Sequence, residues 1–178
     1  MVYIVLGNII ALIASIIMVY SGMLKSKQKV LYAQTIQICL SVISNIILGG
    51  IVGAIVNFIS AIRNILCYKD KLNLLSKILI TVSVVVLSIK FNNIGMIGFL
   101  PLISTIIYLW LMNTKNIIYF KLLIIFTMIL WFVYDLFIKS FTSSIFDMMT
   151  VITNAYSIFK LNNNYKVMKD KKKIYNRN

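Results

Sequence analysis

The chain has 178 residues, of which 61% are hydrophobic and 12% are charged, and its 18 basic residues outnumber 4 acidic ones. Soluble domains carry charge on about a quarter of their residues, so this composition excludes an ordinary soluble fold and predicts an all-α integral membrane protein. Histidine is absent, which excludes histidine-based catalysis and histidine-ligated metal sites. Cys39 and Cys67 both fall inside apolar segments, and we interpret them as packing residues rather than as a disulfide.

Seven apolar segments reach the length of about 20 residues that a helix needs to cross a bilayer. The first begins almost at the start of the chain and has no signal-peptide pattern, so we expect it to stay in the membrane as a span. The apolar runs are continuous rather than alternating, which excludes a lipid-facing barrel. The predicted spans cover, approximately, residues 3–22, 30–48, 50–68, 73–90, 95–112, 117–138 and 141–160.

The basic residues lie mostly on one side of these predicted spans. With the amino terminus outside, the loops after spans one, three and five and the tail hold 15 of the 18 basic residues. The other side holds Lys90 and Lys139, and Arg63 lies inside span three. Cytoplasmic loops carry such an excess of Lys and Arg, so we predict an external amino terminus and a cytoplasmic carboxyl terminus. Anionic lipid, and not nucleic acid, is the expected partner of the basic loops and of the tail at 162–178.

The second half of the chain repeats polar residues of the first half at an offset of 90 residues. Polar side chains are costly inside a bilayer, so a repeated set favours two homologous halves around one shared cavity. The offset pairs spans one to three with spans five to seven and leaves span four unmatched. The matching pairs are Asn57 with Asp147, Asn45 with Asp135, Ser60 with Thr150, Asn64 with Asn154 and Lys25 with Lys115.

We therefore predict seven transmembrane helices arranged as two parallel three-helix repeats joined by a linker helix, a 3+1+3 layout. Residues 1–161 form the membrane domain and residues 162–178 a basic cytoplasmic tail. Within the domain, the first repeat covers about 3–68, the linker about 73–90 and the second repeat about 95–160.

Spans three and seven carry stripes of small and polar residues at spacings of three and four, over 50–64 and 140–154. Such stripes are typical of close helix packing, and that interpretation stays open for the small residues. We assign Asn57 and Asp147 to a solute site, because an intramembrane carboxylate is a functional hypothesis by default. Proton coupling through Asp147 is one consequence that the sequence leaves open.

Spans two and six also place polar residues on one face. Asn45 and its counterpart Asp135 lie near the predicted external end, where Asp135 is either a site residue or simply hydrated. Trp131 either lines a pocket or belongs to the belt of aromatic residues at the membrane interface.

Two further residues are candidates for a gate or a kink. Arg63 either extends toward the lipid headgroups or acts as a gate. Pro101 is the only proline and lies early in span five, where we expect it to kink the helix.

Short motifs in both halves resemble the bacterial inner-membrane protein family typified by YgjV. The resemblance covers most of residues 1–161 and implies a location in the bacterial inner membrane. The motifs are Leu48-Gly49-Gly50, Asn57 and Ala61-Ile62-Arg63-Asn64, with further similarity around Trp131, Ser140 and Asn154.

The predicted layout is also similar to that of the SWEET sugar carriers and the PnuC-type vitamin transporters. In those families, paired asparagines on the third helix of each repeat line the solute site. The resemblance implies this role for Asn57 and Asp147 or, further along the same helices, for Asn64 and Asn154.

The sequence shows no nucleophile beside a base, no metal cluster and no phosphate-binding glycine loop, so we expect neither an enzyme nor a cofactor. Repeated polar residues favour a transporter or facilitator of a small polar solute that works by alternating access. The alternative is a membrane receptor or scaffold that binds a ligand or partner without moving it. The identity of the solute and the formation of a homo-oligomer are left open.

Overall fold

The computed structural model describes residues 2–47, 51–92, 95–137 and 141–175, except for the side chains of residues 2, 4, 141 and 164–175. Over these ranges the chain is helical, with no strand. The elements are α1 (Val2–Met23), α2 (Lys27–Ile47), α3 (Ile51–Tyr68), α4 (Leu74–Phe91), the 3-10 helix η1 (Gly95–Gly98), α5 (Phe99–Leu111), α6 (Ile117–Phe137) and α7 (Phe141–Tyr175). The Leu48-Gly49-Gly50 turn, Lys139 and Ser140 lie outside the described residues.

These segments are rich in Ile and Val, which in water favour strands. In lipid no water satisfies the backbone, so a segment with its own internal hydrogen bonds, a helix, is the stable solution. Large apolar side chains accordingly cover the outside of the bundle, and Phe58, Leu79 and Phe126 are exposed.

Five of the helices in the described part of the chain are long and apolar enough to cross a membrane. They are Val5–Met23, Lys27–Ile47, Ile51–Tyr68, Leu74–Phe91 and Ile117–Phe137. The segment predicted as span five is a shorter apolar helix, Gly95–Leu111, and α7 is not among the five. The protein is therefore a multi-pass helical protein by this measure, while a total of seven spans stays a prediction.

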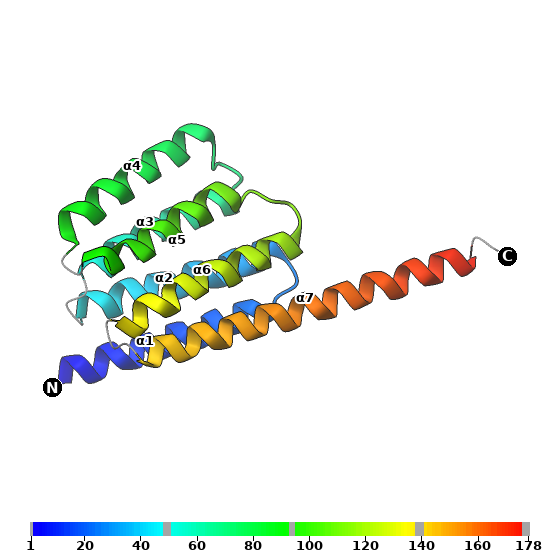
Figure 1. The fold of residues 1–178 in the computed structure, drawn as a ribbon, viewed down its shortest axis with the longest axis horizontal. Coiled ribbons are helices and arrows are strands. Elements are labelled where there is room, and N and C mark those ends of the chain that lie inside the picture. Colours follow the sequence, from blue (N-terminus) through cyan, green and yellow to red (C-terminus); the bar gives the residue numbers. More distant parts are fainter. Residues whose placement is uncertain (1, 48–50, 93–94, 138–140, 176–178) are drawn as a thin grey trace.

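Six of the helices form a closed ring. Following the ring, α1 packs on α2, α2 on α3, α3 on α5, α5 on α6, α6 on α7, and α7 returns to α1. Helix α4 lies outside the ring against α3 and α5 (Figure 1). The interior of the ring is where polar side chains of different helices meet.

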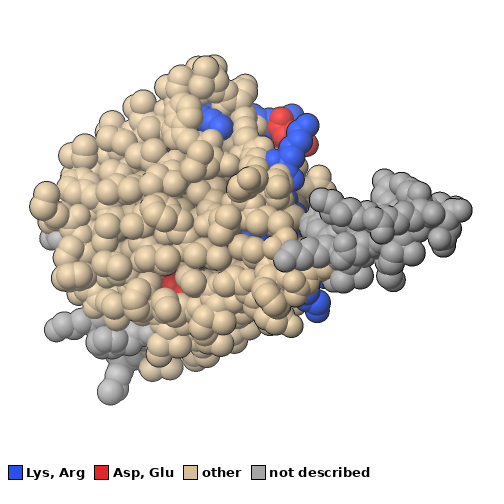
Figure 2. All heavy atoms as spheres, turned by 45° about the vertical axis from the view of Figure 1, so that its right-hand side comes forward, with Lys and Arg blue, Asp and Glu red and all other residues tan. Residues whose placement is uncertain are grey.

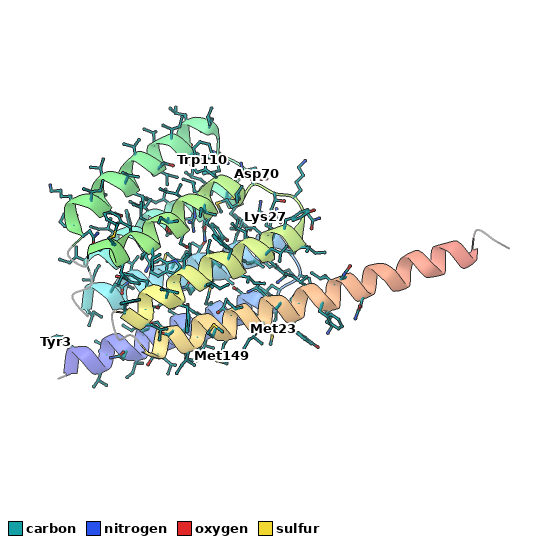
Figure 3. All side chains as sticks on the ribbon, viewed as in Figure 1. Tyr3, Met23, Lys27, Asp70, Trp110 and Met149 are labelled. Atoms are coloured by element: carbon teal, nitrogen blue, oxygen red, sulfur yellow. The ribbon has the colours of Figure 1, made fainter. Side chains whose placement is uncertain are left out.

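The two ends of the bundle differ in charge. The α1–α2, α3–α4 and α5–α6 connections share one end, which we call the basic end and define by the exposed residues Lys25, Lys29, Lys69, Lys71 and Lys115. Figure 2 shows most of the visible blue Lys and Arg side chains toward one side of the molecule. Lys27 and Asp70 mark this end in Figure 3, and Tyr3 marks the opposite end.

Helix α7 runs without a break from Phe141 to Tyr175 and extends well beyond the other helices at the basic end (Figure 1). The predicted boundary between membrane domain and tail at residue 161 falls inside this helix. The backbone therefore does not change conformation there, and the tail begins as a continuation of α7.

Candidate functional site

A cavity of about 220 Å³ lies inside the ring, with lining residues from all six of its helices. Helix α4 contributes none of the lining residues, in keeping with its place outside the ring. Six of the nine residues that the sequence singled out line this cavity. They are Asn45, Asn57, Arg63, Trp131, Asp135 and Asp147.

The other three predicted residues lie elsewhere. Asn64 and Asn154 are fully buried between helices and do not line the cavity. Pro101 is buried in the first turn of α5, directly after η1. A proline in a first turn removes no hydrogen bond from a helix interior. Pro101 lies close to the η1–α5 junction, and a kink at this residue stays a prediction.

Two carboxyl groups meet on one side of the cavity. Asp135 of α6 and Asp147 of α7 are hydrogen-bonded to each other through their side chains. Asp135 is 8% exposed, and the Oδ2 atom of Asp147 is buried without a hydrogen-bond partner. A hydrogen bond between two carboxyl groups needs one proton held between them, so this pair carries a single negative charge when the bond is formed.

Aromatic rings adjoin this carboxyl pair. Trp131 and Tyr134 are both on α6 and both line the cavity, with their ring centroids 5.7 Å apart and their planes at 88°. The lining position of Trp131 supports its interpretation as a pocket residue over a place in the aromatic belt. Aromatic faces and carboxylates together are the usual surroundings of bound organic cations.

An arginine occupies another part of the cavity wall. Arg63 of α3 is 5% exposed, and its guanidinium lies over the ring of Tyr108 at 4.4 Å from the ring centroid. Its Nε donates a hydrogen bond of 3.1 Å to Oδ1 of Asn64. Arg63 therefore faces the interior of the bundle instead of reaching for lipid headgroups.

Tyr108 contacts this arginine from a second helix and is itself held by a hydrogen bond to a third. Tyr108 of α5 is buried, and its hydroxyl donates a hydrogen bond of 2.7 Å to Oε1 of Gln34 on α2. Sequence reasoning missed Tyr108, since one tyrosine in an apolar segment gives little signal. Its spacing of four from Ser104, which also lines the cavity, places both residues on one helical face.

A buried lysine is the second feature that sequence reasoning missed. Lys121 is fully buried, although it is one of the 15 basic residues that the predicted topology assigns to the cytoplasmic side. Its Nζ donates to the carbonyl oxygen of Gly22 at 2.7 Å and to Oδ1 of Asn154 at 3.5 Å. The available signal was its position within α6, next to the buried Phe120 and three residues before the buried Ile124.

The groups in the cavity wall are suited to binding a polar molecule. Within the described ranges, no three His, Cys, Asp or Glu side chains come together as metal ligands. The cavity instead presents amides and hydroxyls on several helices, a carboxyl pair and a guanidinium. Such a wall can hold a small polar molecule by hydrogen bonds and charge.

Comparison with known protein families gives a match over most of the chain. The model of a family described as bacterial inner membrane protein, Imp-YgjV, matches residues 5–165. No curated protein and no solved structure matches the chain, so the similarity of layout to the SWEET and PnuC-type carriers stays a prediction.

Proposed function

Since the chain belongs to the Imp-YgjV family of bacterial inner membrane proteins, we propose that it transports, or facilitates the passage of, a small polar solute across that membrane. The polar cavity inside the ring is the observation that carries this proposal. Side chains from α1, α2 and α3 line it together with side chains from α5, α6 and α7. A solute bound there would contact both halves of the chain.

The order of helices around the ring supports a repeat. The contacts α1–α2, α2–α3 and α3–α5 become α5–α6, α6–α7 and α7–α1 when each helix of the first half is exchanged for its counterpart. A two-fold axis along the membrane normal relates two parallel repeats in the same manner. Under this proposal α4 is the linker that gives both halves the same orientation.

The main packing contacts between the helices of the two halves are α3 with α5 and α7 with α1. Each contains a buried asparagine that accepts a hydrogen bond from a cation. Arg63 donates to Asn64 of α3, and Lys121 donates to Asn154 of α7. Each cation also contacts the other half: the guanidinium of Arg63 lies over the ring of Tyr108 on α5, and Lys121 donates to the carbonyl oxygen of Gly22 on α1. In alternating access one half rocks against the other, and we expect these two contacts to hold the halves together in one of the two states.

The proposal is tested in two steps on the purified full chain. A thermal-shift screen over amino acids, amines, sugars, nucleosides and carboxylic acids first identifies a ligand, because a bound solute raises the unfolding temperature by mass action. The ligand is then offered in radiolabelled form to proteoliposomes with and without the protein. Uptake that depends on the protein supports a transporter. Binding without uptake supports the alternative of a receptor, and the absence of both contradicts a solute site.

A further inference from the structure

The cavity carries opposite charges at two different places in its wall. The acidic place is the hydrogen-bonded pair of Asp135 and Asp147, and the basic place is Arg63. Among the described lining residues these are the three that bear a formal charge. A ligand that carries charge of a single sign would be attracted to one of these places and repelled by the other.

We propose that the cavity binds a small zwitterion, with its ammonium group at Asp135 and Asp147 and its carboxylate at Arg63. The inference rests on the proposed function in that it takes the cavity to be a solute site, and it adds the chemical class of that solute.

The carboxyl pair is suited to an ammonium group. Oδ2 of Asp147 is buried and has no hydrogen-bond partner, which leaves one acceptor ready for a donor. A buried acceptor without a donor costs about 1–3 kcal/mol, and an ammonium group supplies three donors and a positive charge. Trp131 and Tyr134 add ring surfaces to the same helix face, and such surfaces attract cations.

Arg63, on a different helix, is suited to a carboxylate. This side chain is 5% exposed and lines the cavity, yet no carboxylate pairs with it among the described residues. Its hydrogen bond to Asn64 uses Nε, which leaves the Nη groups for a ligand. Burial of an unpaired charge is expensive, and a guanidinium binds a carboxylate through two parallel hydrogen bonds.

The spacing of the two ends favours an extended zwitterion. Helices α3 and α7 both begin at the end opposite the basic end (Figure 1). At about 1.5 Å per residue, Arg63 lies roughly 18 Å along α3 from Ile51, and Asp147 roughly 9 Å along α7 from Phe141. Arg63 thus lies about two helical turns further along its helix than Asp147 does, which suits an amino acid with its charges several bonds apart.

The test is a set of three isosteric probes on the purified wild-type protein, followed by calorimetry. The zwitterion is 5-aminopentanoate, 5-aminopentanamide lacks the carboxylate, and 5-hydroxypentanoate lacks the ammonium. The zwitterion should bind at least about tenfold more tightly than either partial probe, because each end adds a charged hydrogen bond. Equal affinity of a partial probe and the zwitterion would overturn the inference.

Variants then assign the two ends. In Asp147→Asn, the zwitterion should no longer bind more tightly than 5-hydroxypentanoate. In Arg63→Gln, it should no longer bind more tightly than 5-aminopentanamide. Arg63→Lys keeps the cation and should retain part of that advantage. Asp70→Asn is the matched control, because Asp70 is exposed in the α3–α4 turn with a φ of 53°, which asparagine tolerates. An unchanged probe ranking in both cavity variants would contradict the assignment.

Failure of this inference is distinguishable from failure of the proposed function. If none of the three probes binds while a sugar or nucleoside binds and is taken up, the zwitterion is wrong and the transporter stands. If no polar solute binds or crosses, both proposals are wrong.

Discussion

Lys121 of α6 donates a hydrogen bond of 2.7 Å to the carbonyl oxygen of Gly22 of α1, 99 residues away in the chain. Gly22 lies in the last turn of α1, where carbonyl groups lack partners within the helix. A cation at a helix carboxyl end is also favoured by the helix dipole. Lys121 thus connects the first helix to the second half of the molecule without any acidic partner for its charge among the described residues.

Replacement of this lysine tests its structural role. Lys121→Met keeps most of the side-chain length but leaves the Gly22 carbonyl and Asn154 without their donor. We expect a loss of about 1–3 kcal/mol in the free energy of unfolding, measured by thermal or denaturant unfolding in detergent. Lys115→Met is the control, since Lys115 is exposed and should change stability by less than about 0.5 kcal/mol. Equal stability of the two variants would contradict a structural role for Lys121.

The close approach of α1 to α7 depends on Gly22. A Cβ atom at this position would overlap Oγ1 of Thr153 and lie 2.8 Å from Nδ2 of Asn154. We therefore expect Gly22→Ala to destabilise the protein by about 1–3 kcal/mol, as overpacking does. The double variant Gly22→Ala, Thr153→Ala removes the overlapping hydroxyl and should recover part of this loss in a double-mutant cycle. Strict additivity of the two changes would argue against the contact.

Proton release tests the shared hydrogen bond of Asp135 and Asp147. When an ammonium group binds between them, the proton that the pair shares leaves to solvent and two carboxylates face the cation. Affinity for an amine should therefore rise as the pH rises. The titratable side chains lining the cavity are Arg63 of α3, Tyr108 of α5, Tyr134 and Asp135 of α6 and Asp147 of α7, and the described parts of α1 and α2 contribute none.

Calorimetry in two buffers of different ionisation enthalpy counts the protons released. We expect a value near one per bound 5-aminopentanoate for the wild type, and a value near zero for Asp147→Asn, which holds no such shared proton. Binding without proton release in the wild type would contradict displacement of the shared proton by the ammonium group.

Membrane topology gives a prediction that is independent of any ligand. Reporter fusions after Lys71 and after Asn178 should read cytoplasmic, and a fusion after Lys90 should read external, because the exposed lysines gather at the basic end. A fusion after Lys115 tests the shorter segment Gly95–Leu111 and should also read cytoplasmic if that segment crosses the membrane. An external reading at Asn178 would exclude an odd number of spans with the amino terminus outside.

Much of the fold is predictable because lipid leaves the chain few choices. An apolar segment in a bilayer must satisfy its own backbone, so composition alone indicates helices, and hydropathy indicates approximately where they lie. The important polar positions can also be recognised in the sequence. An amide or carboxylate in such a segment costs too much free energy to occur there at random. For this reason Asn57 and Asp147 stand out in the sequence and both line the cavity in the structure.

The tertiary structure decided which polar residues face one another. The spacing of Asn64 and Asn154 in the stripes is the same as that of the cavity residues, yet both are packed between helices. In the sequence Lys121 resembles a basic residue that flanks a span. In the structure it donates a hydrogen bond to the carbonyl oxygen of Gly22. Tyr108 has no distinguishing pattern until α3 and α5 meet and Arg63 covers its ring. Helical periodicity gives the face of a single helix, whereas the rotation and depth of six packed helices depend on contacts between residues far apart in the chain.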